Sequence, residues 1–170
     1  FLDASKVFKH LLSRSKATNI KRKAPTPFTT SSLQQSASNK YNMSPKITMG
    51  IAQKLYQNGK ITYMRTDNPK ISQEFGAKIN KMVDNNYGNI YLGDCGHIST
   101  KNDGAHAHEC IRPTNIDEQQ LSSKLFSPQE RNLYHLIWKQ TIQSCMANAG
   151  GQQYKCFITA PEERKYVHTF

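Results

Sequence analysis

Tyr63 and Arg65, in the stretch KITYMRTD (residues 60–67), are the residues whose types and spacing most directly suggest chemistry. A free tyrosine hydroxyl has a pKa of about 10, so only about 0.1% of it is ionised at pH 7. A nucleophilic tyrosine therefore needs a base, a nearby cation or a polarised partner that supplies on the order of 4 kcal/mol. In an extended segment, residues two apart face the same side, which would place Arg65 beside Tyr63.

An arginine in that place can hold a phosphate through paired N–H bonds and can stabilise charge that develops in a transition state. Taken alone, the pair is more typical of a short strand whose tyrosine and arginine make a surface cation–π contact. The local chemistry of KITYMRTD favours this second interpretation, so the rest of the chain must decide.

A second set of reactive side chains lies in AHAHECIRPT, residues 105–114. It holds His106, His108, Glu109 and Arg112. His108 can donate to a phosphate oxygen or move a proton. Arg112, four residues on, would share its face if the segment is helical. The alternative is a polar helix end with a surface histidine.

A zinc site is a third interpretation. Cys95, His97, His108 and Cys110 form a C-x-H…H-x-C pattern whose side chains all suit zinc. The spacing matches none of the common structural zinc patterns. The sequence also shows no acidic cluster of the kind that binds magnesium.

The composition favours a nucleic-acid partner. The net charge of the 170 residues is +11 and the pI is about 9.6, which predicts attraction to polyanions. The alternative is that the charge only serves solubility. An apolar share of 36% and a mean hydropathy of −0.70 suggest much exposed or inter-domain surface around one core of ordinary size.

Other features bear on the cellular setting. No apolar run approaches membrane-spanning length, and the amino end lacks the order of a signal peptide. The four cysteines include no CxxC pair, which favours a reducing intracellular setting. Because the chain starts at Phe1 and stops inside an expected strand, we expect it to be a piece of a larger protein.

The amino-terminal part is predicted to be a helix and an extended connector. Apolar residues recur at helical spacing within residues 2–16, with basic residues largely on the other face. Pro25 and Pro27 cannot donate to a sheet ladder, so they suit an extended connector or an edge strand. A domain boundary is expected near Phe28.

The middle of the chain is predicted to be helical. Thr29 or Thr30 can cap the first helix, and Ile47, Ile51 and Leu55 form the expected buried stripe of the second. The last helix opens with a capping box and is apolar on more than one side, which predicts a central position. The four helices are expected at about residues 29–40, 45–58, 73–87 and 128–146.

The remaining stretches are predicted to be loops and strands. Residues 89–104 are rich in Gly, Asp, Asn and Ser and are expected to be a loop. Gly150 and Gly151 are expected to break the chain, and YKCFITA and KYVHTF to form two strands about a polar turn. The predicted fold class is mainly α with minor β (α+β), a helix-turn-helix-like middle between strand-bearing ends.

Four motifs in order carry a resemblance to a known family. PFTTSSLQQSASNK, LYQNGKITYMRTD, AHECIRPT and LYHLIWKQ, within about residues 27–146, resemble the tyrosine-bearing region of type IA DNA topoisomerases. That region reads PFTTSTLQQ-A-S, GLITYMRTDS, AHEAIRPT and LY-LIW. Each motif alone is weak, but their joint order and spacing are specific. The M of YMRTD and the E and R of HECIRPT resemble the topoisomerase I branch.

The resemblance implies a function for the reactive residues. Tyr63 would attack a DNA phosphodiester and form a 5′-phosphotyrosine, the other strand would pass through the break, and resealing would relax negative supercoils. Arg65 matches the arginine that contacts the scissile phosphate, and His108 matches the histidine that assists there. Thr66 is expected mainly to position the loop. The expected DNA contacts are Arg65, Thr66, His108 and Arg112.

The resemblance also implies a domain arrangement and a cofactor. Residues 1–28 and 150–170 would belong to a β-rich arch domain, and residues 29–149 would form the helical catalytic-tyrosine domain. The Mg²⁺ of such enzymes is bound by an acidic Toprim domain that these residues do not include. We therefore expect no metal site here, no DNA relaxation by the isolated chain, a monomer without membrane contacts, and an intracellular, DNA-associated location.

Two departures and two alternatives remain. Asn68 replaces the usual serine and Cys110 replaces the usual alanine, and both changes are expected to be tolerated. The main alternative is a helix-turn-helix DNA-binding module without chemistry, in which KITYMRTD is only a strand. The other alternative is a zinc-stabilised interaction module.

Overall fold

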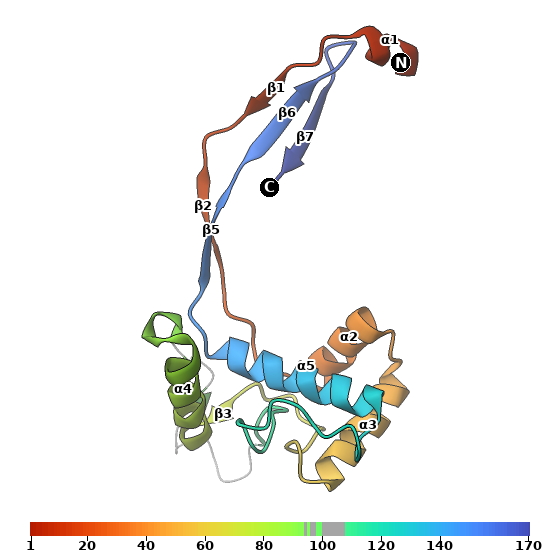
Figure 1. Cartoon of the computed structure of the whole chain (residues 1–170). Coiled ribbons are helices and arrows are strands. Elements are labelled where there is room, and N and C mark those ends of the chain that lie inside the picture. Colours follow the sequence, from red (N-terminus) through yellow and green to blue (C-terminus); the bar gives the residue numbers. More distant parts are fainter. Residues whose placement is uncertain (94, 96–97, 100–107) are drawn as a thin grey trace. The chain divides into compact units, whose positions relative to one another are not determined.

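The computed structural model describes residues 1–93, 95 and 108–170 and the backbone of residues 98–99 (Figure 1). The chain divides into two compact units. The first combines Phe1–Lys23 with Asn148–Phe170, and the second is Ala24–Ala147. The boundaries expected from the sequence, after residues 28 and 149, lie near these divisions, and the assignment of the first unit to an arch domain stays a prediction.

The first unit consists of antiparallel strands from both ends of the chain. β2 (Thr18–Arg22) pairs with β5 (Ala149–Gln153) as a two-stranded ribbon. A three-stranded sheet has the order β1-β6-β7. Its strands are β1 (Leu12–Arg14), β6 (Lys155–Thr159) and β7 (Lys165–Thr169), and the two carboxy-terminal strands are the two predicted from the sequence.

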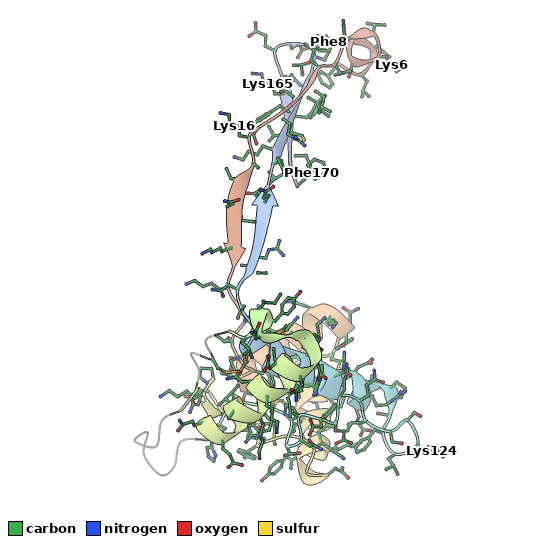
Figure 2. The ribbon with its side chains drawn as sticks, turned by 60° about the vertical axis from the view of Figure 1, so that its left-hand side comes forward. Lys6, Phe8, Lys16, Lys124, Lys165 and Phe170 are labelled. Atoms are coloured by element: carbon green, nitrogen blue, oxygen red, sulfur yellow. A yellow bond between two sulfur atoms is a disulfide. The ribbon has the colours of Figure 1, made fainter. Side chains whose placement is uncertain are left out.

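This unit carries most of the excess positive charge. It holds 10 of the 23 basic residues and 3 of the 12 acidic ones, a net charge of +7 out of +11. All ten basic side chains are exposed. Figure 2 labels three of them: Lys6 on α1 (Leu2–Val7), Lys16 between β1 and β2, and Lys165 on β7. The strands therefore present a basic, solvated surface.

Two predictions for this unit were wrong. The helix expected over residues 2–16 ends at Val7, and β1 follows it. α1 has no buried residue and no side-chain cap, so nothing extends a helix that is marginal without packing. Gly150 and Gly151 do not break the chain but pair with Lys21 and Ile20 in the ribbon. In both places, pairing with a distant strand satisfies the backbone and overrides the local signal.

The second unit is a helical core with the four predicted helices. Its helices are α2 (Thr30–Tyr41), α3 (Pro45–Gln57), α4 (Gln73–Tyr87) and α5 (Pro128–Ser144). β3 (Ile71–Ser72) pairs in parallel with β4 (Ile98–Ser99), and a short η1 turn (Asn89–Tyr91) follows α4. The prediction of a loop over residues 89–104 was therefore partly wrong, because η1 and β4 lie within it. Together with the sheets of the first unit, these elements confirm the α+β fold class.

The caps explain why these helices start where they do. Thr29 and Ser32 form a capping box for α2, and Ser127 and Glu130 form one for α5. α5 buries residues on more than one side and is central, as predicted. The expected stripe of α3 was partly wrong. Ile47 is exposed, and its place is taken by Thr48, whose hydroxyl donates to the Ser44 carbonyl and is satisfied inside the core.

No helix within the described ranges combines the length and the apolar character that a membrane crossing requires.

Candidate active site around Tyr63

Tyr63 lies in an extended segment that leaves α3 through a glycine turn. Gly59 has a φ of +67°, a conformation that favours glycine, and it follows the helix as predicted. Beyond it, the side chains alternate. Met64 and Thr66 are buried, whereas Tyr63 and Arg65 are exposed. The two reactive residues therefore share the solvent side of the segment, as the i, i+2 spacing predicts.

The CIRPT part of the second motif holds this segment from one side. The N–H of Thr62 donates to the Arg112 carbonyl at 2.9 Å, and the Thr62 hydroxyl accepts from the Arg112 N–H at 3.0 Å. The same hydroxyl donates to the Cys110 carbonyl at 2.7 Å. Ile61 and Pro113 form an antiparallel bridge. Two motifs that lie about fifty residues apart in sequence are thus joined backbone to backbone.

The first turn of α2 holds the segment from another side. The hydroxyl of Thr30 donates to the Met64 carbonyl at 2.8 Å and accepts from the Thr66 N–H at 2.9 Å. The Thr30 N–H donates to the Thr66 carbonyl, also at 2.9 Å. Reasoning from the sequence missed this role, because it treated Thr29 and Thr30 as alternative caps. Once Thr29 takes the cap, the second threonine of PFTT is free to orient the loop.

Three aromatic rings form a cluster at the site. The ring centroids of Tyr63 and His108 are 5.6 Å apart, and those of Tyr63 and Tyr56 are 5.3 Å apart in an edge-to-face contact. All three side chains are exposed, Tyr63 by 37% and Tyr56 by 42%. The structure therefore brings His108 to Tyr63, as expected, and adds Tyr56, which the sequence analysis did not single out. His106 lies outside the described residues.

The hydroxyl of Tyr63 and the guanidinium of Arg65 are open to a ligand. Within the described part of the chain, no hydrogen bond or ion pair is recorded for either group. Both residues are exposed, and the ring of Tyr63 lies beside those of His108 and Tyr56. A tyrosine hydroxyl and an imidazole thus lie side by side, with the guanidinium of Arg65 on the same side of the segment, and groups of these kinds can bind a phosphate.

Thr66 and Asn68 shape the turn that follows Arg65. Thr66 is only 8% exposed, and its hydroxyl accepts from the Asn68 N–H at 3.1 Å. The side-chain carbonyl of Asn68 accepts from the Lys70 N–H at 3.0 Å, so this departure from the family's serine closes the turn. The positions of these groups favour a loop-positioning role for Thr66 over a DNA contact, which stays a prediction.

Arg112 is engaged within the protein. Its Nε donates to the Glu109 carboxylate at 2.6 Å, and its guanidinium lies 3.8 Å from the ring centroid of Phe75. Its side chain is 13% exposed. Residues 108–114 contain no helix, so Arg112 does not share a helix face with His108. The DNA contact expected of Arg112 stays a prediction, and the geometry favours a role in anchoring the segment that carries His108.

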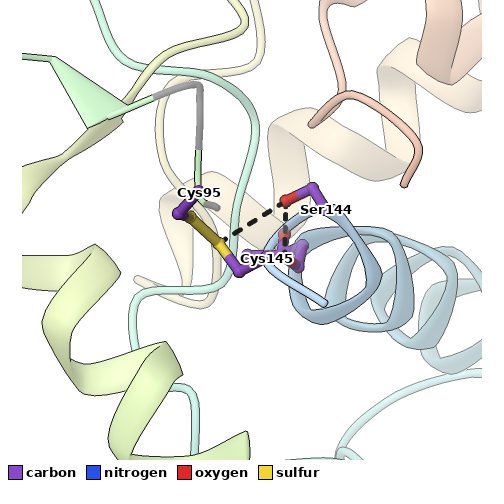
Figure 3. The surroundings of a disulfide bond; sticks show 4 residues. Cys95, Ser144 and Cys145 are labelled. Atoms are coloured by element: carbon purple, nitrogen blue, oxygen red, sulfur yellow. Dashed lines mark hydrogen bonds between the residues drawn. A yellow bond between two sulfur atoms is a disulfide. The ribbon is translucent and has the colours of Figure 1, made fainter. Parts of the chain in front are cut away.

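A disulfide joins Cys95 to Cys145 at the end of α5 (Figure 3). The sequence had favoured a reducing intracellular setting, in which no disulfide was expected. Backbone contacts bring the two cysteines together: the Gly93 N–H donates to the Cys145 carbonyl at 3.0 Å, and the Ala147 N–H donates to the Tyr91 carbonyl at 2.9 Å. A Cβ at position 93 would lie 2.2 Å from the Met146 oxygen, so this approach requires glycine.

The cysteine environments do not support the zinc interpretation. The sulfur of Cys95 is bonded to Cys145, and Cys110 is fully buried. Burial raises the pKa of the Cys110 thiol to about 12, which disfavours the thiolate that zinc needs. His97 lies outside the described residues. Among the residues that the structure describes, no group of three or more His, Cys, Asp or Glu side chains could hold a metal ion.

Comparison with known proteins agrees with these motifs. The family model described as DNA topoisomerase matches residues 3–169. The chain belongs to the DNA topoisomerase family. Its relatives identify it as a segment of the type IA enzymes, in the topoisomerase I branch that the motifs indicated.

Several relatives of this topoisomerase segment are named DNA topoisomerase 1. The protein of Buchnera aphidicola is 45% identical over 125 residues, which cover 73% of this chain and 14% of the relative. That of Campylobacter jejuni is 38% identical over 168 residues, 92% of this chain and 24% of the relative. A mimivirus relative, "DNA topoisomerase 1 type prokaryotic", is 40% identical over 86% of this chain and 17% of its own length.

The fold of the segment is that of a solved topoisomerase. The structure of full-length topoisomerase I from Thermotoga maritima matches with a TM-score of 0.78 and 28% identity, covering 99% of this chain and 29% of that one. The chain thus spans between 14% and 24% of the length of the curated relatives reported above.

Proposed function

We propose that this chain supplies the nucleophilic tyrosine of a type IA topoisomerase. The Tyr63 oxygen attacks a DNA phosphodiester, a Tyr63 O–P bond forms, the P–O3′ bond breaks, and the 3′ oxygen leaves with a proton. The reverse transfer reseals the strand after another strand has passed, so negative supercoils are relaxed. The observation that carries the proposal is the exposed Tyr63 ring, 5.6 Å from that of His108 and on the same side as Arg65.

The neighbouring residues have distinct roles in this proposal. The planar fork of Arg65 binds the two non-bridging oxygens of the scissile phosphate and stabilises the charge that builds up on them. His108 donates a hydrogen bond to the same phosphate. Thr30, Thr62 and Thr66 hold the backbone so that Tyr63 and Arg65 keep their common side.

Magnesium does not fit the residues described here, because they include no ligand cluster for a metal ion. By resemblance, Mg²⁺ belongs to the acidic Toprim domain of such enzymes, and no step is derived through it. We accordingly propose that the isolated chain does not relax DNA. We also propose that the enzyme acts as a monomer on single-stranded segments of DNA inside the cell.

The test uses a full-length topoisomerase that contains this segment. Its substrate is a single-stranded oligonucleotide that carries one label on the 5′ side of the cleavage point and another label on the 3′ side. Tyr63→Phe should abolish the covalent adduct with the 5′ phosphate. Arg65→Lys should lower adduct formation, since a point charge does not replace a planar fork. Tyr87→Phe, a matched change at an exposed tyrosine of α4, should leave the adduct intact. Normal adduct formation by Tyr63→Phe would exclude Tyr63 as the nucleophile. The remaining interpretation of the segment would then be the DNA-binding module without chemistry.

A further inference from the structure

Tyr56 occupies an unusual place for a large aromatic residue. It lies in the last turn of α3, next to the fully buried Leu55, yet 42% of it is exposed. It therefore contributes little to the core. Its ring instead packs edge-to-face on Tyr63, with centroids 5.3 Å apart and an angle of 68° between the planes. Within the described part of the chain, no hydrogen bond of its hydroxyl is recorded.

The contact between Tyr56 and Tyr63 adds a third exposed ring to the site. The rings of Tyr56 and His108 both lie against that of Tyr63, with centroid spacings of 5.3 and 5.6 Å, and each side chain is exposed. An edge-to-face pair leaves ring surface uncovered. Exposed rings beside a cation are the surfaces on which bases of single-stranded nucleic acids stack, and every base has a face that fits them.

We propose that Tyr56 is a DNA-binding residue that stacks on a nucleobase close to the scissile phosphate. The inference rests on the proposed role of Tyr63, whose ring marks where that phosphate lies. In duplex DNA, each strand carries one phosphate per about 3.4 Å of helix axis. A ring 5.3 Å from the nucleophile's ring therefore reaches a base within one or two nucleotides of the cleaved bond.

Stacking on Tyr56 would complement the phosphate contact of Arg65. The arginine binds the backbone of any sequence, whereas the stacked base fixes how the strand lies across Tyr63. The stack also explains why a tyrosine at the end of α3 is left exposed when its neighbour Leu55 is buried. The competing explanation is that Tyr56 only supports the Tyr63 ring from the side.

An abasic substrate separates the two explanations. Affinity is measured by fluorescence anisotropy in the full-length Tyr63→Phe enzyme, which binds without cleaving. One oligonucleotide is intact, and each of four others has a single abasic site. The four abasic sites are at the first and second positions on the 5′ side of the mapped cleavage point and at the first and second positions on its 3′ side. Loss of one stacked base is worth about 1–3 kcal/mol, which corresponds to about 5- to 150-fold in Kd.

In this background, Tyr56→Leu should weaken binding of the intact strand by about 5- to 150-fold. On one of the abasic strands, Tyr56→Leu should not weaken binding further, because the base that Tyr56 would contact is absent. Tyr56→Phe should restore the affinity lost in Tyr56→Leu, and Tyr87→Leu on α4 should behave like the parent protein.

An equal loss on all five strands would show a supporting role and overturn the proposal, as would an unchanged Kd. The two proposals fail separately. If Tyr63→Phe still forms adducts, the nucleophile assignment fails, whatever Tyr56 does. If that variant forms none but Tyr56→Leu binds normally, only the stacking proposal fails.

Discussion

The hydroxyl of Thr30 accepts a hydrogen bond from the backbone N–H of Thr66 at 2.9 Å and donates one to the carbonyl of Met64 at 2.8 Å. One side chain in the first turn of α2 thus fixes the peptide groups on both sides of Arg65. The two bonds hold the backbone conformation at Arg65, and this conformation sets the side to which the Arg65 side chain points.

Thr30→Val should therefore damage both stability and chemistry. It keeps the shape of the side chain but leaves two partly buried backbone groups without their partner. The free energy of unfolding of the chain in urea should fall by about 1–3 kcal/mol. Adduct formation by the full-length enzyme should slow at the same time. Thr30→Ser retains the hydroxyl and should lose much less of both, so equal losses in the two variants would contradict the assigned role.

Cys110 should be chemically silent in the folded chain. Burial raises the pKa of its thiol to about 12, so at pH 8 only about one thiol in 10⁴ is ionised. Iodoacetamide should therefore modify Cys156, the other free and only half-buried cysteine, while Cys110 reacts only after unfolding. Intact-mass measurement over time follows both sites, with Cys156→Ser as the control. Modification of Cys110 at the rate of Cys156 in the native chain would contradict its burial.

The capping box of α5 predicts a pH dependence of stability. The Ser127 N–H donates to the Glu130 carboxylate at 2.8 Å, and this bond lowers the pKa of Glu130 below its ordinary value of 4.5. Because the folded pKa lies below the unfolded one, the ionised form stabilises the fold. The contribution is complete above about pH 4.5 and is lost as the pH falls through the folded pKa.

Glu130→Gln should isolate this contribution. Glutamine can still accept the Ser127 hydrogen bond but carries no charge near the helix N-terminus, so at pH 7 the variant should be less stable by about 0.3–1 kcal/mol. The difference should shrink as the pH is lowered from 5 to 3. Urea unfolding at several pH values measures it, with Glu163→Gln in the other unit as the control. A difference that stays constant over this range would exclude the titration of Glu130 as its source.

The basic charge predicts salt-sensitive binding of single-stranded DNA by the chain itself. Ten exposed basic residues give the first unit a net charge of +7. Phosphate contacts release counterions, and the slope of log K against log salt is about −0.7 per neutralised phosphate of a single strand. Weak binding that falls steeply between 50 and 200 mM salt is expected in anisotropy titrations. Changing Lys21 and Arg22 of the ribbon and the adjacent Lys23 to Gln should reduce the slope, whereas a flat salt response would contradict backbone binding.

Helix ends were predictable from the sequence because short-range signals determine them. A cap at Thr29 or Thr30, a cap at Ser127 and a glycine at position 59 were predicted to mark helix ends through contacts within a few residues. The structure confirms these ends and assigns the first cap to Thr29. The meeting of Tyr63 and His108, which lie 45 positions apart in the numbering, was predictable only through the resemblance of the four motifs. Periodicity and composition alone favoured an ordinary strand.

The errors lie where distant parts of the chain decide the outcome. Strand β1 replaces the end of the expected first helix because Leu12 pairs with Ile158, far along the chain. Gly150 and Gly151 form a strand because β2 lies opposite. The roles of Thr30 and Tyr56 at the site depend on contacts with the Tyr63 segment that no local pattern encodes.

The measurement that tests the central claim most directly is the identification of the residue that carries DNA. A full-length topoisomerase containing this segment is allowed to cleave a short single strand, the complex is trapped by denaturation, and the peptides are mapped by mass spectrometry after nuclease treatment. We predict a 5′-nucleotide remnant on Tyr63 and on none of the other tyrosines, and no remnant in Tyr63→Phe. A remnant on Tyr56, on any other residue, or on Tyr63→Phe protein would contradict the account.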